Sequence, residues 1–463
     1  MSAQSEVLSQ KSAGGIAPPQ RALWPLLFVL VTTGVVSARL FRLVNRYAVN
    51  IFFWDQWDFN NATLFQKHSF WEMFRWQHGP HRQGVGAVVS WLFGPMFHWN
   101  SRAEAFLACA IFVLAALLAL YLKERLYGPV TYFDAVIPLI FLTPLEYETL
   151  FGTTNLAHGP LPILLLVIYC IGWTLSRPLT RYAWILVTNF LLIYTGFGIF
   201  IGLITPLLLV LDYWRHKRTG VPGPTAVASL VAILIAVGSF FSFFIGYKFD
   251  PAAACFKPFS EPMMQYVHYA GLMFVNFTGI KGSGVIPTLI GSMILIWSGV
   301  ALVAALAGIL SRKEESAAQN LVGAALLIFS LLFCANTALG RLCMGLLTAQ
   351  SSRYLPYLIP AFLGIYFSCL AYRSKSLKTV GTIIFLVIAV SAAVPVRIGD
   401  RSMMAQYHNV KDSWRSCYLQ HHDIQQCDSL TGVKVYPSPE ATHLKEKLDF
   451  LEEKKLNLYA TRD

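Results

Sequence analysis

Apolar stretches of about 20 residues recur from Leu23 to Pro395, with short polar turns between them. Lipid offers the backbone no hydrogen-bond partners, so only helices and closed barrels cross a bilayer. These stretches are apolar on every face and do not alternate, which predicts helices rather than barrel strands. We therefore expect an all-α polytopic membrane protein with about eleven transmembrane helices. The expected spans lie near residues 23–43, 103–122, 129–146, 157–176, 182–196, 198–212, 225–246, 287–310, 319–338, 353–371 and 379–395.

Three apolar segments are not predicted to be single, straight transmembrane helices. Residues 182–212 are either two short helices broken at 195–198 or one long bent helix. Residues 265–280 are apolar enough for a helix in the membrane interface. If residues 85–99 crossed the membrane, the basic turn at 123–125 would lie on the outer side, against the positive-inside rule. Loop charge therefore favours an interfacial helix for residues 85–99 as well.

Composition agrees with a membrane protein. Hydrophobic residues make up 56% of the chain and charged residues 13%, which excludes a soluble enzyme, a disordered tail protein and a disulfide mini-domain. The net charge of +12 comes from 36 Lys and Arg against 24 Asp and Glu. Because much of the basic excess lies in short loops, as the positive-inside rule demands, we expect membrane lipids as partners and no nucleic acid.

The basic residues also predict orientation and organisation. They follow every second span, which places the N-terminus in the cytoplasm. We expect a flexible cytoplasmic tail at 1–22, a transmembrane domain at 23–395 with its first outer loop at 44–102, and a small periplasmic C-terminal segment at 396–463, helical over 440–458. The expected location is a bacterial inner membrane. The basic turns carry Lys123 and Arg125, Arg177 and Arg181, Arg215, Lys217 and Arg218, Arg312 and Lys313, and Arg373, Lys375 and Lys378.

The chain has eight cysteines and no C-x-x-C pair, which argues against a zinc or redox site. Most of them lie in or near spans and are expected to be packing residues. Cys417 and Cys427 are the only close pair in a polar segment. They would form a disulfide in an oxidising compartment.

The first outer loop is the part of the chain densest in titratable and aromatic groups. It carries Asp55 and Asp58, then His78, His81 and Arg82. A carboxylate there can act as a general base on an acceptor hydroxyl, and two can hold a divalent cation such as Mg²⁺ or Mn²⁺. His and Arg can hold a phosphate leaving group. The aromatic residues that can stack on a sugar are Trp54, Trp57, Trp71 and Trp76.

Together these groups suit transfer from a phosphate-bearing lipid, and the alternative is an ordinary interfacial belt of solvated charges and Trp. Two later groups can face the same outer cavity. Arg341 and Arg353 bracket an apolar outer loop and can hold a lipid phosphate or pyrophosphate, unless they only snorkel. The other group, which can equally be a polar loop cap, comprises Glu146, Glu148, Asn155 and His158.

The order of these parts resembles the C-type membrane glycosyltransferases, which take sugar from a polyprenyl-phosphate donor on the outer face. The matching parts are the acidic motif Asp55-Gln-Trp-Asp58, the turn His78-Gly-Pro-His-Arg82, a helix to Phe93-Gly94, Arg102, and the basic turn Lys123 to Gly128. The motif Ser352-Arg353-Tyr354 resembles one in uncharacterised bacterial polytopic proteins and adds Tyr354 to the expected cavity. The acids are not adjacent here, which leaves open which Asp is the base.

Three functions remain open. The first is an inverting glycosyltransferase that moves a sugar from a polyprenyl-phosphate donor to a cell-envelope glycan or lipid acceptor, with Asp55 or Asp58 as base. The second is a polysaccharide polymerase or ligase, which would carry its catalytic groups on a large later loop. The third is a lipid-linked sugar transporter or flippase, which would carry charges inside its spans.

Overall fold

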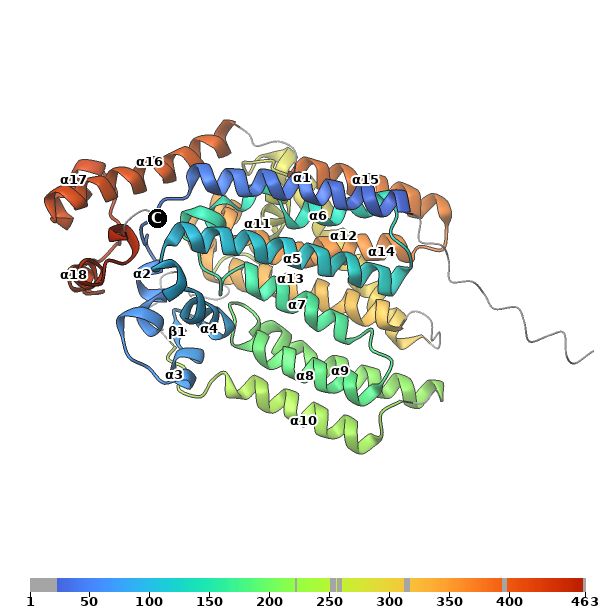
Figure 1. Ribbon diagram of the computed structural model, residues 1–463. Helices are drawn as coiled ribbons and strands as arrows, with labels where there is room; N and C mark the ends of the chain where they lie inside the picture. The colour runs from blue at the N-terminus through green and yellow to red at the C-terminus, as the bar shows by residue number, and fades with distance from the viewer. Residues whose placement is uncertain are drawn as a thin grey trace, which may run out of the picture.

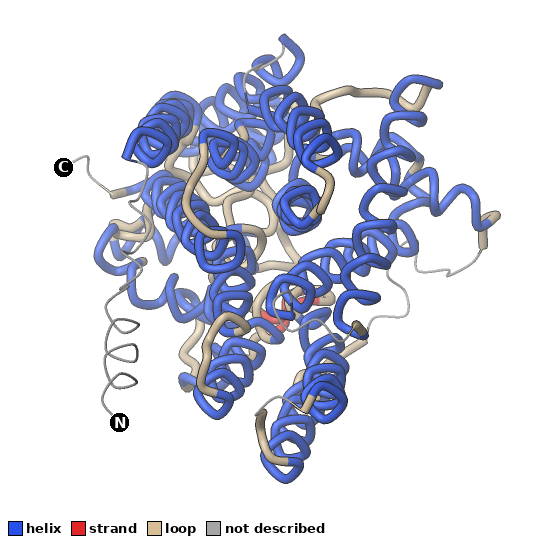
Figure 2. Tube along the Cα trace, turned by 90° about the vertical axis from the view of Figure 1, so that its right-hand side faces the viewer, coloured by secondary structure: helices blue, strands red, loops and turns tan. Residues whose placement is uncertain are grey.

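The computed structural model of the 463-residue chain describes residues 23–220, 223–249, 255, 260–311, 317–393 and 398–460. Its helices run side by side along one direction, and a second view looks along them (Figures 1 and 2). Seven described helices are long and apolar enough to cross a membrane, which confirms an all-α membrane protein. They are α1 (Leu23–Tyr47), α5 (Ser101–Tyr127), α9 (Ile199–Thr219), α12 (Val285–Leu310), α13 (Ala317–Arg341), α14 (Ile359–Ala371) preceded by the 3₁₀ helix η8 (Ser352–Leu358), and α15 (Lys375–Ala393).

Shorter helices occupy the other apolar segments, so the count of about eleven spans stays a prediction. The stretch 182–212 forms two helices, α8 (Pro178–Ile193) and α9, and not one long bent helix. The expected third span, 129–146, is broken into η3 (Tyr132–Ala135), α6 (Val136–Phe141) and η4 (Pro144–Glu146). Pro144 has no N–H to continue a helix. The remaining short helices are α7 (Pro160–Gly172), α10 (Ala226–Ser242) and α11 (Met263–Phe277).

Helix α11 was expected in the membrane interface, but its C-terminal half packs inside the bundle. Residues 272–277 are at most 1% exposed. The close approach of α11 to α12 depends on glycine, because a Cβ on Gly291 would lie 2.2 Å from the carbonyl oxygen of Gly271. The bundle core therefore includes this short helix.

The short basic turns gather at the end of the bundle opposite the first outer loop (Figure 1). Arg125 donates to the carbonyl of Thr174 (3.2 Å), and Arg218 donates to that of Leu310 (3.3 Å). Near the same end, Asp134 caps η3 and pairs with Lys123 at 2.7 Å. Asp134 therefore closes the start of this helix, because its carboxylate accepts the backbone N–H of Thr131 (2.6 Å). The basic pair Arg312 and Lys313 and the expected N-terminal tail, 1–22, lie outside the described residues.

The first outer loop folds into short pieces. They are α2 (Gln56–Phe59), the π-helix η1 (Asn61–Phe65), α3 (Phe70–Phe74), the hairpin strands β1 (Gln77–His78) and β2 (His81–Arg82), α4 (Gly84–Phe93) and η2 (Pro95–Phe97). At ten residues α4 is too short to cross a bilayer. It lies close to residue 157, since a Cβ on Gly86 would meet that of Ala157 at 2.4 Å. Its exposed Trp91 and Leu92 suit the expected interfacial position.

The C-terminal segment is a folded unit docked on the first outer loop, at the same end of the bundle (Figure 1). It comprises α16 (Ile398–His421), α17 (Ile424–Thr431), α18 (Leu444–Lys454) and η9 (Asn457–Tyr459). Leu444, Leu448 and Leu451 of α18 are all 0% exposed, which confirms the predicted amphipathic helix. Their buried cluster also contains Phe52 and Trp57 of the first loop.

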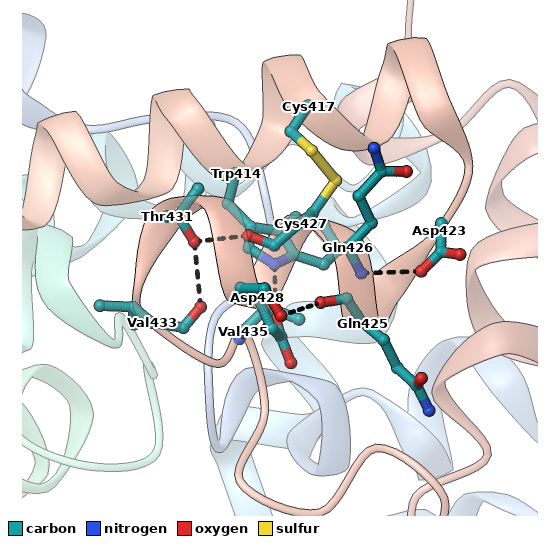
Figure 3. Close-up of a disulfide and its surroundings, with 11 residues drawn as sticks. Trp414, Cys417, Asp423, Gln425, Gln426, Cys427, Asp428, Thr431, Val433 and Val435 are labelled. Atoms are coloured by element: carbon teal, nitrogen blue, oxygen red, sulfur yellow. Dashed lines mark hydrogen bonds between the residues drawn. A yellow bond between two sulfur atoms is a disulfide. The ribbon is translucent and has the colours of Figure 1, made fainter.

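Two disulfides are present among the described residues. Cys417 on α16 bonds to Cys427 on α17, as the sequence suggested (Figure 3). Cys255 bonds to Cys343, and this pair was not predicted because the two lie 88 residues apart. The packing role expected of most cysteines holds for the four that are free and buried, Cys109, Cys170, Cys334 and Cys369.

Candidate functional site

A cavity of about 980 Å³ is lined by the first outer loop, the connection between the π-helix η5 (Glu148–Gly152) and α7, the segment after α10, α13 and η8. It is large enough for a sugar phosphate, since small-molecule sites span roughly 300–1,000 Å³. Segments distant in sequence thus meet at one place. Ten of the residues singled out in the sequence line it, namely Asp55, Trp76, His78, His81, Arg82, Asn155, His158, Arg341, Arg353 and Tyr354.

The two candidate acids have different surroundings. Asp55 lines the cavity, and its carboxylate accepts no hydrogen bond from the described residues. Asp58 does not line the cavity. Its carboxylate accepts hydrogen bonds from the hydroxyls of Tyr436 and Thr442 and lies 3.7 Å from the ammonium of Lys447. Only Asp55 is therefore placed to meet a ligand in the cavity.

Gln56 fixes the position of Asp55. Its side chain is 1% exposed, accepts a hydrogen bond from the backbone N–H of Phe53 and donates one to the carbonyl of Thr154 (2.9 Å). Thr154 directly precedes Asn155, which lines the cavity. The loop that bears Asp55 is thereby tied to the segment that bears Asn155.

The hairpin places two histidines at the cavity. His78 and His81 are directly paired across β1 and β2, and the His81 ring meets that of His158 edge-on at 4.7 Å. Burial lowers the pKa of His78, although the carboxylates of Asp55 and Asp58 act in the opposite direction. Burial also holds the pKa of His81 well below its usual value. At neutral pH the two rings are uncharged and can bind by hydrogen bonds rather than as cations.

Arg82 lines the cavity but is already committed to backbone oxygens. Its guanidinium donates to the carbonyls of Arg75, Phe243 (2.8 Å) and Ile245 (2.9 Å). The side chain is 3% exposed and also lies over the ring of Tyr247. Arg82 therefore fastens the hairpin to the end of α10, which leaves little of its donor capacity for a phosphate.

Arg341 and Arg353 present exposed guanidinium groups at the cavity. Among the described residues neither forms an ion pair with a carboxylate. The Arg341 guanidinium donates to the sulfur of Met344, its one side-chain hydrogen bond within the described part of the chain. The Arg353 guanidinium lies over the ring of Tyr354, 5.6 Å from its centroid. Two accessible guanidinium groups beside one cavity form a ready site for a phosphate.

Glu148 positions Arg353 from outside the cavity. Its carboxylate accepts hydrogen bonds from the backbone N–H of Arg353 (3.0 Å), the hydroxyl of Ser351 (2.8 Å) and the hydroxyl of Tyr407 (3.2 Å). Glu146, the other acid of this turn, is 1% exposed and also does not line the cavity. Glu146 and Glu148 were both expected to face the cavity. Glu148 instead orders the backbone segment that carries the Arg353 guanidinium.

The tryptophans of the acidic motif face the C-terminal segment instead of the cavity. The indole of Trp54 donates to the carbonyl of Lys434 (3.2 Å). Trp57 is fully buried, and its carbonyl accepts from the ammonium of Lys447 (3.0 Å). They hold the loop in place rather than meeting a ligand.

Several lining residues were not selected from the sequence. Arg75 adds positive charge at the cavity, while Phe197, Thr337 and Tyr357 add aromatic and neutral polar groups. Thr337 and Tyr357 lie within apolar stretches, where nothing local distinguishes them from packing residues. Only the helix arrangement shows that they reach the cavity.

The divalent cation expected at Asp55 and Asp58 stays a prediction. Within the described ranges, no group of three or more His, Cys, Asp and Glu side chains is arranged to hold a metal ion. The oxygens of Asp58 are already occupied by Tyr436 and Thr442. The two carboxylates thus do not make a ready pair of ligands.

Comparison with protein-family models, with curated proteins and with solved structures finds no match to this chain. The functional interpretation therefore depends on the geometry of the cavity, and the resemblance to the C-type membrane glycosyltransferases stays a prediction.

Proposed function

We propose that this chain is an integral-membrane glycosyltransferase of the C type, which moves a sugar from a polyprenyl-phosphate donor to an envelope glycan or lipid acceptor at the outer face. One observation carries the proposal. A single cavity holds the Asp55 carboxylate, which accepts no hydrogen bond from the described residues, together with the accessible guanidinium groups of Arg341 and Arg353. Transfer from a glycosyl phosphate needs such a base beside such an anion site.

The reaction follows from these two groups. An acceptor hydroxyl oxygen attacks the anomeric carbon of the donor while its proton passes to the Asp55 carboxylate. A bond forms between the acceptor oxygen and the anomeric carbon. The bond from that carbon to the phosphate oxygen breaks on the opposite face, and its electron pair leaves with the polyprenyl phosphate. The configuration at the anomeric carbon is inverted.

The leaving phosphate gains negative charge as the bond breaks, and cations placed beforehand stabilise that charge. Arg341 and Arg353 can each bind two phosphate oxygens through the planar fork of the guanidinium. Glu148 keeps the backbone of Arg353 in position by accepting its N–H. No step requires a metal ion, because the cavity itself supplies the positive charge.

The test is transfer of radiolabelled hexose from polyprenyl-phosphate hexose by the purified protein in lipid nanodiscs, with an extract of envelope glycans and lipids as acceptor. We expect Asp55→Asn to slow transfer by about 10²–10⁴-fold, the range for loss of a general base. Arg341→Gln should raise the KM for the donor. Thr33→Val is a matched control, because Thr33 is buried in α1 and bonds only within that helix.

Two results would contradict the proposal. Transfer at an unchanged rate by a folded Asp55→Asn variant would remove the base from the mechanism. Absence of transfer with any hexosyl donor, combined with movement of the labelled lipid across a sealed vesicle membrane, would identify a lipid-linked sugar transporter instead.

A further inference from the structure

Five polar atoms among the cavity-lining residues are buried and have no hydrogen-bond partner in the described chain. Two of them are Nε of Arg82, whose guanidinium already bonds backbone carbonyls, and the hydroxyl oxygen of Tyr357. The other three lie on an amide, an imidazole and an aliphatic hydroxyl. They are the amide nitrogen of Asn155, Nε2 of His158 and the hydroxyl oxygen of Thr337. The side chains of Asn155 and Thr337 are each 5% exposed. Since buried polar atoms are almost always paired, three unpaired atoms at one cavity indicate a bound molecule that supplies the partners.

The orientation of Asn155 supports this interpretation. Its side-chain oxygen accepts a hydrogen bond from the backbone N–H of Ala157 (2.7 Å), which fixes the amide plane. The other end of the amide, with two N–H donors, is left without a protein acceptor. The loop itself thus determines which end of Asn155 is free.

The groups near these three atoms are partly aromatic, and the buried cation of the same lining, Arg82, is committed to backbone carbonyls. The rings of Phe59 and Phe197 line the cavity, and Phe59 stacks on His158 with 5.4 Å between ring centroids. Burial keeps the pKa of His81 well below its usual value, so this ring adds no positive charge at neutral pH. The cations Arg341 and Arg353, by contrast, are exposed.

The spacing along α13 relates the buried part to the exposed cations. Thr337 and Arg341 are four residues apart, so they lie on the same face of the helix about 6 Å apart along its axis. One helical turn is comparable to the distance across a sugar ring. A phosphate at Arg341 would therefore place its attached sugar beside Thr337.

We propose that Asn155, His158 and Thr337 form the subsite for the transferred sugar, and that this subsite takes a neutral polyhydroxylated ring rather than a uronic acid. The inference rests on the proposed function and specifies its donor. The amide, imidazole and hydroxyl bond the ring hydroxyls, the aromatic rings contact its apolar face, and the phosphate lies outward at the guanidinium groups.

The experiment measures equilibrium binding to the full chain in lipid nanodiscs, in the Asp55→Asn background so that no turnover occurs. The probes are bare polyprenyl phosphate, its glucosyl, galactosyl and mannosyl esters, and its glucuronosyl ester. We expect at least one neutral ester to bind about tenfold more tightly than the bare lipid phosphate, and the glucuronosyl ester to show no such gain.

The variants separate the sugar from the phosphate. Thr337→Val preserves shape and removes the hydroxyl, and Asn155→Asp keeps the acceptor for Ala157 while removing the amide donors. Both should abolish the gain for the neutral ester. Thr337→Val should leave the affinity for bare polyprenyl phosphate unchanged, whereas the new carboxylate of Asn155→Asp should also weaken the bare phosphate by charge repulsion. Thr33→Val and Tyr121→Phe, both outside the cavity lining, are the controls and should preserve the gain.

The subsite is overturned if every ester binds no more tightly than the bare lipid phosphate, which would mean that water fills this part of the cavity. It is also overturned if Thr337→Val, which introduces no charge, weakens bare phosphate and ester equally. If the wild type binds a neutral sugar ester selectively but transfers no sugar, the proposed subsite is supported and the proposed transferase function is rejected. Transfer by the wild type, with sugar binding unaffected by the variants, would support the proposed transferase and reject the proposed sugar subsite.

Discussion

The hydroxyl of Tyr436 donates a hydrogen bond to the carboxylate of Asp58, although the two residues are 378 positions apart. Burial and the neighbouring carboxylate raise the pKa of Tyr436, which keeps the hydroxyl protonated and able to donate. Asp58 belongs to the same helical turn as Asp55, whose carbonyl accepts its backbone N–H. The C-terminal segment therefore supports the loop that brings the candidate base to the cavity.

Replacing Tyr436 with Phe should loosen that loop. A hydrogen bond to a charged group contributes about 1.5–3 kcal/mol, and Thr442 still bonds Asp58 in the variant. We expect faster amide hydrogen exchange over residues 50–60 and slower transfer, with Tyr121→Phe unchanged. Exchange in this loop identical to that of the wild type would show that the C-terminal segment does not support it.

The disulfide of the C-terminal segment should stabilise this segment, which holds the loop that bears Asp55 and Asp58. Cys417–Cys427 joins α17 to α16, and Asp428 of α17 accepts hydrogen bonds from the indole of Trp414 (2.7 Å) and the N–H of Val435 (3.3 Å), as Figure 3 shows. Closing a loop of this length stabilises a fold by about 2–3 kcal/mol.

We therefore expect the Cys417→Ser, Cys427→Ser double variant to be cut faster by protease between residues 423 and 436. A membrane-impermeant reductant should have the same effect on the wild type and none on the double variant. Equal cleavage rates for oxidised, reduced and double-variant protein would contradict this role.

Arg82 and Arg341 should differ in what their loss affects. Arg82→Gln leaves carbonyls at the end of α10 without their donor, so we expect a loss of about 2–5 kcal/mol in the free energy of unfolding. Arg341→Gln breaks no ion pair among the described residues and should leave thermal stability unchanged while raising the KM for the donor. Thermal unfolding and transfer kinetics on both variants test the contrast, which fails if Arg341→Gln lowers the melting temperature as much as Arg82→Gln.

His81 should make the folded protein sensitive to acid. Its pKa is lower in the folded state than in the unfolded chain, where it is near the ordinary value of about 6.5. Below that pH the unfolded chain takes up a proton that the folded protein does not, so stability is complete above about pH 6.5 and falls as the pH decreases. For one histidine the slope is at most about 1.4 kcal/mol per pH unit.

The measurement is the melting temperature between pH 7 and pH 5 for the wild type and His81→Gln. We expect the wild type to lose more stability across this range than the variant, because Gln carries no titrating group. Parallel curves for the two proteins would show that the pKa of His81 is the same in the folded and unfolded states.

Local patterns predicted the helices well where the apolar stretch was long. Residues 23–47, 101–127 and 285–310 are continuous apolar helices, since a run of apolar residues in lipid has few alternatives. The stretch 129–146 was predicted less well. Its hydrophobicity is high, but the backbone breaks near Pro144, and hydrophobicity alone does not report such a break.

The sequence by itself determined that the chain is an α-helical membrane protein, that its basic turns share one end and that titratable and aromatic residues are densest in the first outer loop. These properties depend on composition and on spacing over a few residues, and they are visible without a fold. Only the tertiary structure decided which residues meet. It placed Asp55 at the cavity, bonded Asp58 to Tyr436, committed Arg82 to backbone carbonyls, and brought Thr337 and Asn155 to the same cavity. Those contacts join segments hundreds of residues apart, and their geometry depends on how the helices pack rather than on any local pattern.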